Sequence, residues 1–168
     1  CDEIQCGLGR TGAFLASDAM RLDPDIITLA KPLAGGLPMG AILLKEHVAS
    51  ALQPGEHGTT FGGGPFVAHV AHHVVQRLAD PAFLRQVSDN GAWFRAQLET
   101  LMAEHPQAIR AVRGAGLMWG VDTTEPAGGI IERARHAGLL LLSAGPPLVI
   151  SRDDLGRGIA MLRTAILG

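Results

Sequence analysis

The first part of the chain carries its apolar residues in short runs that alternate with glycine- and proline-containing stretches. Two runs of four, residues 26–29 (IITL) and 41–44 (AILL), are bounded by such stretches, and this pattern predicts two short strands. We expect short helices at 15–20 and 46–52, and a long glycine-rich loop at 53–64 (QPGEHGTTFGGG). This mixture of elements predicts an α/β arrangement.

From residue 65 the apolar spacing changes to that of amphipathic helices. Residues 65–80 and 81–105 both repeat apolar side chains every three or four positions and have proline at or near the first turn. One face of the second predicted helix carries five apolar residues: Phe83, Val87, Phe94, Leu98 and Leu101. We therefore expect two consecutive helices here, the second with a buried face.

Beyond Pro106, strand-like and helical patterns alternate over shorter distances. The predicted order is strand, helix, strand and helix, at residues 108–122, 130–138, 139–143 and 153–166. The fold class that follows is α/β, with an α/β part at 1–80 and an α+β domain at 81–168. The predicted boundary between them lies near Asp80.

Composition and charge exclude several classes of function. Apolar residues make up 47% of the sequence and the net charge is −2 without a basic run, which favours a folded core and argues against nucleic-acid binding. The apolar runs are too short to span a membrane. Cys1 and Cys6 show neither a zinc spacing nor a disulfide framework, and the pair His69 and His73 lacks the acid of H-E-x-x-H. We expect no metal and a cytoplasmic protein.

Residues 7–12 (GLGRTG) match the G-x-G-x-x-G pattern of dinucleotide-binding loops. Such a loop requires a helix that begins inside it and an acidic residue at the end of the next strand, about 20 residues further on. Here the following segment is short and contains Pro24, and the next predicted strand leads to Lys31 instead of an acid. We therefore reject a dinucleotide site.

Asp2 and Lys31 lie at the ends of predicted strands, where ligands bind in α/β sheets. Lys31 and Lys45 are the only lysines among 14 basic residues, and an amine offers a nucleophilicity that arginine lacks. Arginine-rich codon usage is the alternative explanation. A carboxylate near a lysine suits pyridoxal phosphate, because the lysine forms a Schiff base while the acid holds the protonated ring nitrogen. Thr59 and Thr60 could offer hydroxyls to its phosphate.

The chain resembles the class III pyridoxal-phosphate aminotransferases, and the acetylornithine type most closely. Four stretches carry the resemblance: DEIQCGLGRTG, PDIITLAKPLAGGLPMGA, GEHGTTFGGGP and VRGAGLMWGVD. The resemblance extends over nearly the whole chain. It implies part of a fold-type-I transferase, namely the end of the large, mainly parallel-sheet cofactor domain followed by the small C-terminal domain.

The resemblance also implies roles for single residues. Asp2 would pair with the pyridine nitrogen of the cofactor, Ile4 would pack on one face of the ring, and Gln5 would hydrogen-bond near its 3-hydroxyl. Lys31 would be the catalytic residue, which carries the internal aldimine and then moves a proton between the substrate Cα and the cofactor. Thr60 would bind the cofactor phosphate of the other subunit in a homodimer.

Thr59, by the same resemblance, would lie near the substrate. The implied reaction is transamination of N-acetylornithine with 2-oxoglutarate, a step of arginine biosynthesis. Ornithine, 4-aminobutyrate and acetyl-lysine aminotransferases share these motifs and stay open as alternatives. Because enzymes of the family carry further binding residues before the position of Asp2, we expect this chain to be incomplete and inactive by itself. An inactive fragment or a dimerisation module without cofactor is the remaining alternative.

Overall fold

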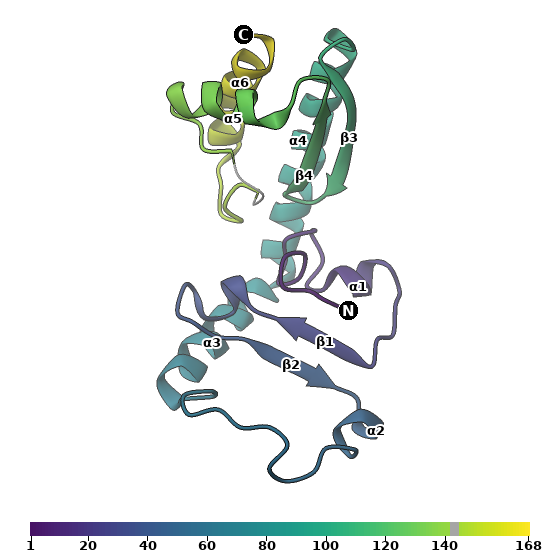
Figure 1. Cartoon of the computed structure of the whole chain (residues 1–168), viewed down its shortest axis with the longest axis vertical. Coiled ribbons are helices and arrows are strands. Elements are labelled where there is room, and N and C mark those ends of the chain that lie inside the picture. The colour runs from purple at the N-terminus through teal and green to yellow at the C-terminus, as the bar shows by residue number, and fades with distance from the viewer. Residues whose placement is uncertain (142–144) are drawn as a thin grey trace. The chain divides into compact units, whose positions relative to one another are not determined.

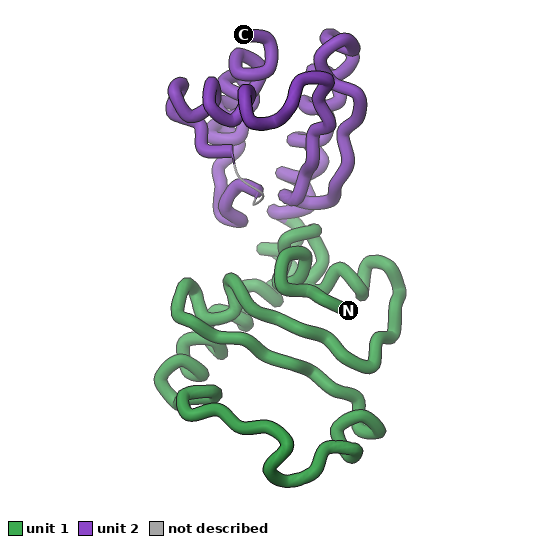
Figure 2. The backbone as a smooth tube through the Cα atoms, in the orientation of Figure 1, with its two compact units in different colours: residues 1–85 green, residues 86–168 purple. Residues whose placement is uncertain are grey.

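The computed structural model describes residues 1–141 and 145–168 (Figure 1). The chain divides into two compact units, residues 1–85 and 86–168 (Figure 2). This division falls within the long helix α4 (Pro81–Glu104). No helix in the described ranges is long and apolar enough to cross a membrane.

A two-stranded sheet forms the centre of the first unit. β1 (Ile26–Leu29) and β2 (Ala41–Leu44) pair antiparallel, with Ile26 opposite Leu44. Both strands coincide with the two apolar runs, so these predictions are confirmed. The chain leaves β1 through the short 3₁₀ helix η1 (Lys31–Ala34) before it returns as β2 (Figure 1).

Asp2 extends this sheet on the other edge of β1. It forms an isolated parallel bridge with Thr28, which is the only parallel pairing among residues 1–141 and 145–168. The parallel character expected for this domain is therefore represented here by one bridge. The named strands among the described residues pair only as antiparallel neighbours.

Three helices complete the first unit. α1 (Ala16–Ala19) and α2 (Glu46–Ala49) are single turns, whereas α3 (Pro65–Leu78) begins at its proline, as the sequence predicts. α3 packs against η1 so closely that a Cβ added to Gly35 would lie 3.3 Å from Val74 Cγ2. Buried apolar residues from β1, η1 and α3 include Leu29, Leu33, Ala34, Ala71 and Leu78.

The second unit contains an antiparallel hairpin, β3 (Ile109–Ala115) and β4 (Met118–Thr123). The strand-like stretch 108–122 is thus two strands, because Gly116 adopts a left-handed φ of 53° and turns the chain. Helix α4 approaches this turn directly. A Cβ on Gly91 would come within 2.3 Å of the Gly116 carbonyl oxygen, so the approach requires glycine.

Helices α5 (Ala127–His136) and α6 (Arg152–Leu167) pack together within the second unit. The buried core of this unit joins α4, the hairpin and both helices through six residues: Leu101, Ile109, Ile130, Ala134, Ala165 and Ile166. α6 begins with a true cap, since the Ser151 hydroxyl accepts a hydrogen bond from Asp154 N at 3.0 Å.

The strand predicted at 139–143 is wrong for its first three residues, and its last two lie outside the described residues. Leu139 donates its backbone N–H to Ala134 O at 2.8 Å, which ends α5, and its side chain packs against the core. A strand needs a neighbour for its backbone groups. Among the described residues, the two strands of the hairpin pair only with each other.

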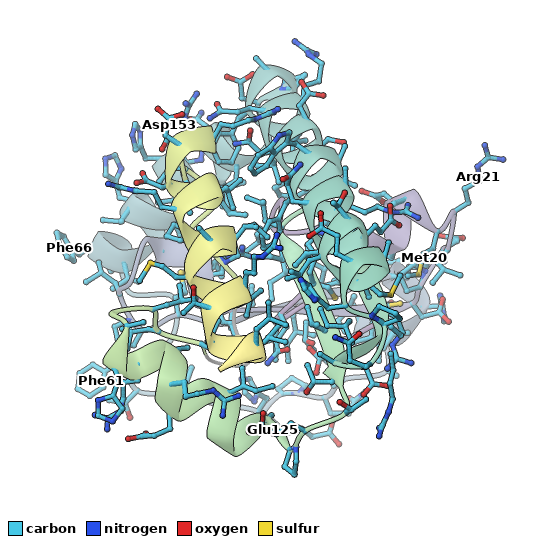
Figure 3. All side chains as sticks on the ribbon, turned by 90° about the horizontal axis from the view of Figure 1, so that it is seen from above. Met20, Arg21, Phe61, Phe66, Glu125 and Asp153 are labelled. Carbon is cyan, nitrogen blue, oxygen red and sulfur yellow. The ribbon has the colours of Figure 1, made fainter. Side chains whose placement is uncertain are left out.

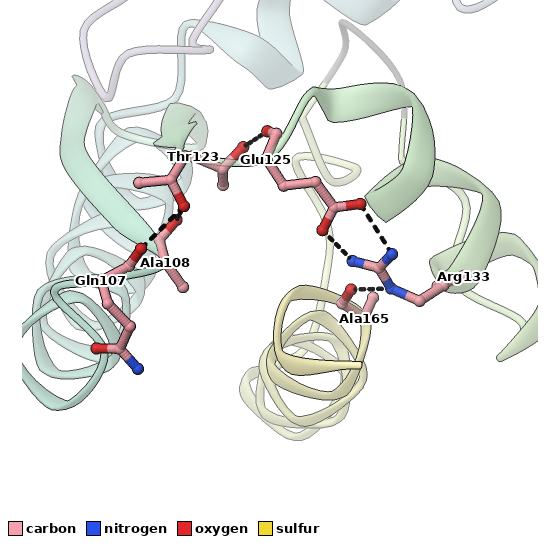
Figure 4. Close-up of polar contacts among 7 residues, drawn as sticks. Gln107, Ala108, Thr123, Glu125, Arg133 and Ala165 are labelled. Atoms are coloured by element: carbon pink, nitrogen blue, oxygen red, sulfur yellow. Dashed lines mark hydrogen bonds and ion pairs between the residues drawn. The ribbon is translucent and has the colours of Figure 1, made fainter.

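A half-buried set of polar contacts connects α5 and the segment before it to the end of α6 (Figure 4). Arg133 and Glu125 form a bidentate ion pair, in which Nη1 donates to Oε1 at 2.9 Å and Nη2 donates to Oε2 at 2.6 Å. The Nε of Arg133 donates to Ala165 O at 2.7 Å. The hydrogen bond from Arg133 holds the pKa of Glu125 below its ordinary value. The contact to Ala165 O satisfies a carbonyl at the end of α6 that has no partner within the helix.

Candidate functional site

Asp2 presents an exposed but oriented carboxylate. Its Oδ1 accepts hydrogen bonds from Ile4 N at 3.0 Å and from Thr28 Oγ1 at 3.2 Å. Its Oδ2 accepts no hydrogen bond from any described residue. The carboxylate is therefore held by one oxygen and can accept a further donor with the other.

Lys31 follows β1 by two residues and is the first residue of η1. The prediction that it ends the strand is thus corrected by two positions. Its backbone φ is +42°, a left-handed conformation that costs a non-glycine residue roughly 1–2 kcal/mol. Backbone strain of this kind persists only where the surrounding structure enforces it, and strained residues are concentrated at functional sites.

The two lysines of the chain have different surroundings. Lys45 contacts two carboxylates, Asp23 at 2.8 Å and Asp25 at 3.4 Å, and the hydrogen bond to Asp23 raises the pKa of Lys45 above its ordinary value. Lys31 is exposed and has no ion pair with any described residue. Of the two lysines, Lys31 is therefore the one whose side-chain amine has no carboxylate partner among the described residues.

The structure brings Asp2 and Lys31 to the same end of β1. Asp2 is bridged to Thr28, and Lys31 follows Thr28 by three residues, a stretch of chain that can reach at most about 11 Å. Ile4 and Gln5 continue directly from Asp2, Ile4 half-buried and Gln5 exposed. These four predicted site residues thus share one neighbourhood.

Thr59 and Thr60 lie elsewhere in the first unit, in a stretch that is exposed throughout. Thr59 lines a pocket of about 310 Å³ together with seven other residues: Pro38, Met39, Gly40, Phe61, Gly62, Gly63 and Val67. The Thr59 hydroxyl accepts from Gly62 N at 3.1 Å, which leaves its own proton available. Neither Asp2 nor Lys31 lines this pocket. Among the described residues, no hydrogen bond or ion pair joins either threonine to Asp2 or Lys31 within one chain.

The loop that contains GLGRTG is held by hydrogen bonds between its own backbone groups, and no helix begins inside it. Gly9 N donates to Phe14 O at 3.1 Å, and Gly12 N donates to Gly9 O at 3.0 Å. The first helix, α1, begins only after the loop has ended. The rejection of a dinucleotide loop therefore agrees with the local structure.

Glu3 is a functional candidate that the sequence analysis missed. Its side chain is only 2% exposed, and its carboxylate accepts from Ser17 N at 2.7 Å and from Ala16 N at 3.0 Å. Gly7 leaves it room, since a Cβ there would lie 2.9 Å from Glu3 Cβ. Burial raises the pKa of Glu3, but the hydrogen bonds from Ser17, Ala16 and Cys6 outweigh it and lower the pKa overall. Glu3 thus closes the loop beside Asp2.

Replacing Glu3 by glutamine is expected to lower the free energy of unfolding by about 2 kcal/mol at pH 7, the scale of hydrogen bonds to a buried charge. Because the folded-state pKa lies below the ordinary value of 4.5, this stabilisation is present above pH 4.5 and is lost as the pH falls through the folded pKa. Urea denaturation between pH 3 and pH 7 measures the difference, which should narrow at acid pH.

The matched control for this prediction is Glu99→Gln. Glu99 is an exposed glutamate on α4 that pairs with Arg95 at 2.7 Å. Loss of that surface pair should change the free energy of unfolding by less than about 0.5 kcal/mol. Equal stabilities of Glu3→Gln and the unaltered protein at pH 7 would contradict the role given to Glu3.

Comparison with known proteins adds to this geometry. The sequence matches the family described as Aminotransferase class-III over residues 1–166. It is 43% identical over 169 residues to the mitochondrial acetylornithine aminotransferase of Alnus glutinosa, with 96% of this chain and 37% of that protein covered. It is 44% identical over 176 residues to the acetylornithine aminotransferase of Xanthomonas campestris pv. campestris, with 98% and 43% covered.

A solved structure gives the same result at the level of fold. The ornithine aminotransferase of Toxoplasma gondii, crystallised with oxidised glutathione and with PLP partly occupying its active site, superposes with a TM-score of 0.88. The two are 32% identical, and the match covers 99% of this chain and 42% of that one. This chain therefore has the mixed α/β fold of part of a fold-type-I enzyme.

The chain spans about two fifths of the length of these relatives, 37%, 43% and 42% in the three comparisons. Within that span the match is nearly complete, and it includes the neighbourhood of Asp2 and Lys31 together with the loop of Thr59 and Thr60. Because the family match extends over residues 1–166 of the 168, the chain belongs to the class III aminotransferases.

Proposed function

We propose that the natural protein containing this chain catalyses the pyridoxal-phosphate-dependent transamination of N-acetylornithine with 2-oxoglutarate, a step of arginine biosynthesis. The observation that carries the proposal is that two residues lie at the same end of β1: Asp2, whose carboxylate is oriented by hydrogen bonds, and Lys31, which has no ion pair with a described residue. Relatives at 43% and 44% identity are named acetylornithine aminotransferases, which supports this choice of donor.

The residues present fit the proposed cofactor. Pyridoxal phosphate offers a ring nitrogen, an aldehyde and a phosphate, which call for a carboxylate, an amine and hydroxyl or backbone N–H donors. Asp2 has one carboxylate oxygen without a hydrogen bond from the described residues, and Lys31 has an exposed amine. Thr60 is exposed and the Thr59 proton is available, so both can donate to a phosphate or a substrate.

In the proposed mechanism, Lys31 is the residue that acts at the reacting atoms. When bound, pyridoxal phosphate supplies an electron sink for the substrate Cα. Lys31 would hold the cofactor through its Nζ amine and, once displaced by the donor amine, would take up and return the proton at the donor Cα. Lys31 suits this task because its amine has no carboxylate partner among the described residues, in contrast to Lys45.

The other residues of the site would bind and orient. Asp2 would keep a positive charge on the ring nitrogen, which strengthens the electron sink. Gln5, exposed beside Asp2, would hydrogen-bond near the ring 3-hydroxyl, and the half-buried Ile4 would pack on one ring face. Ile4 also fixes Asp2 through its backbone N–H, so both functions of Ile4 come from the same turn.

We propose further that the active protein is a homodimer in which each phosphate site takes Thr60 from the partner subunit and Thr59 lies near the substrate. Two observations support this. The stretch around both threonines is exposed, and the pocket that Thr59 lines excludes Asp2 and Lys31. Phe61, beside them, is 91% exposed and projects from the surface (Figure 3). Its exposure agrees with the proposal, since aromatic residues are enriched at protein interfaces.

Two assignments extend the proposal. We assign residues 1–80 to the end of the cofactor domain and residues 81–168 to the small domain. The division into compact units between Arg85 and Gln86 lies close to this boundary. We assign the protein to the cytoplasm, because its two cysteines are both free.

The test is a substrate panel with the purified natural protein and added pyridoxal phosphate. Glutamate formed from 2-oxoglutarate is measured with N-acetylornithine, ornithine, 4-aminobutyrate and acetyl-lysine as donors. The proposal expects the highest kcat/KM for N-acetylornithine. A higher value for another donor would replace the substrate but keep the reaction, and absence of glutamate with every donor would leave a non-catalytic dimerisation module as the function.

A further inference from the structure

We propose that Thr28 is a positioning residue for Asp2: its hydroxyl fixes Asp2 Oδ1 to β1 and leaves Oδ2 as the oxygen that accepts the hydrogen bond of the protonated cofactor ring. This inference rests on the proposed function, because it concerns the partner of the same ring nitrogen. Thr28 lies within the stretch PDIITLAKPLAGGLPMGA, but the resemblance gave its side chain no role.

Three hydrogen bonds connect Thr28 to the start of the chain. Thr28 N donates to Cys1 O at 3.0 Å, Glu3 N donates to Thr28 O at 3.0 Å, and Thr28 Oγ1 donates to Asp2 Oδ1 at 3.2 Å. The two backbone bonds lie on either side of the Asp2 and Thr28 bridge. The hydroxyl bond is therefore made from a position that the backbone already holds.

The two donors to Asp2 Oδ1 differ in what they fix. Ile4 N belongs to the same turn as Asp2, so its bond at 3.0 Å holds the carboxylate relative to its own backbone only. Thr28 belongs to β1, the strand that leads to Lys31 three residues later. The Thr28 hydroxyl is thus the side-chain contact that holds the carboxylate relative to the segment carrying the lysine.

This arrangement also distinguishes the two carboxylate oxygens. Oδ1 receives both hydrogen bonds, and Oδ2 receives none from residues 1–141 or 145–168. A carboxylate whose rotation is limited by donors on one oxygen presents the other in a narrow range of directions, and such preorganisation increases the strength of the next hydrogen bond. Thr28 acts through Asp2 and does not itself need to touch the cofactor.

The experiment compares Thr28→Val with Thr28→Ser in the natural protein. Valine keeps the shape and strand preference of threonine without the hydroxyl, whereas serine keeps the hydroxyl. The dissociation constant of pyridoxal phosphate is measured by titrating the cofactor-free protein and following tryptophan fluorescence. We expect Thr28→Val to bind about five- to tenfold more weakly, the size of one hydrogen bond to a charged group in a partly exposed site. Thr28→Ser should stay within about twofold of the unaltered protein.

A double-mutant cycle separates positioning from a general structural role. In an Asp2→Ala background the acceptor is absent, so adding Thr28→Val should not weaken cofactor binding further. Urea denaturation of the cofactor-free variants supplies a second readout, in which Thr28→Val and Thr28→Ser should have similar free energies of unfolding.

Three results would overturn the proposal: cofactor binding by Thr28→Ser as weak as by Thr28→Val, further weakening by Thr28→Val in the Asp2→Ala background, or an equal loss of unfolding free energy in Thr28→Val. Any one of these, while the unaltered protein binds pyridoxal phosphate, removes the role of Thr28 and leaves the proposed function intact. Failure of the unaltered protein to bind the cofactor removes both.

Discussion

Replacing Lys31 by alanine in the natural protein is expected to abolish the visible absorption band of lysine-bound cofactor and to reduce transamination by several orders of magnitude. The side chain is the proposed nucleophile and proton carrier, and alanine can do neither. Arginine should not restore activity, because a guanidinium remains protonated and cannot act as the nucleophile. Absorption spectra and glutamate formation with N-acetylornithine measure both effects.

Lys45→Ala is the matched control for this substitution. Lys45 is paired with Asp23 and Asp25 at the surface, so its loss removes ion pairs without touching the site. We expect a spectrum and a turnover rate close to those of the unaltered protein. A Lys31→Ala or Lys31→Arg protein with near-normal turnover would disprove the assignment of the catalytic lysine.

Replacing Asp2 by asparagine is expected to slow proton removal from the donor Cα by about two to four powers of ten. Loss of one member of an ion pair that the bound cofactor would bury costs roughly 3–5 kcal/mol, and an effect confined to the transition state converts directly into rate. Asparagine keeps an oxygen that can accept from Ile4 N and Thr28 Oγ1, so the turn and cofactor binding should persist. The rate of the isolated half-reaction with the amino donor measures the effect.

Asp18→Asn is a suitable comparison for the charge change alone. Asp18 is exposed on α1, in the same unit as Asp2, and the substitution removes the same charge there. The half-reaction of this variant should proceed at the rate of the unaltered protein. An unchanged rate in Asp2→Asn would show that the carboxylate does not tune the cofactor ring.

Local patterns in the sequence predict most elements of the fold correctly. The apolar runs at 26–29 and 41–44 coincide with β1 and β2, and proline opens α3 and α4 where it was expected. Apolar runs bounded by turn residues and proline at a first helical turn are determined by neighbours in sequence. The strand expected at 139–143 failed because strand formation depends on a partner that no local pattern provides.

The candidate site divides in the same way. Asp2 and Lys31 are recognisable from residue type, from strand ends and from resemblance to the family. Glu3 and Thr28 are not, since Glu3 binds backbone N–H groups 13 and 14 residues away, and Thr28 binds a carboxylate 26 residues away. A glutamate beside a site residue and a threonine in a strand have no distinctive pattern in the sequence.

By itself, then, the sequence determined most elements and the family of this protein, and it supplied Asp2 and Lys31 as candidate site residues, because each of these depends on residue type and on short spacing. Only the tertiary structure decided which oxygen of Asp2 is occupied, which lysine is free of carboxylates, and that Lys31 starts η1 with a left-handed backbone. These properties arise from contacts between segments distant in sequence. Their geometry depends on how β1, the first turn and the following loop fold against one another.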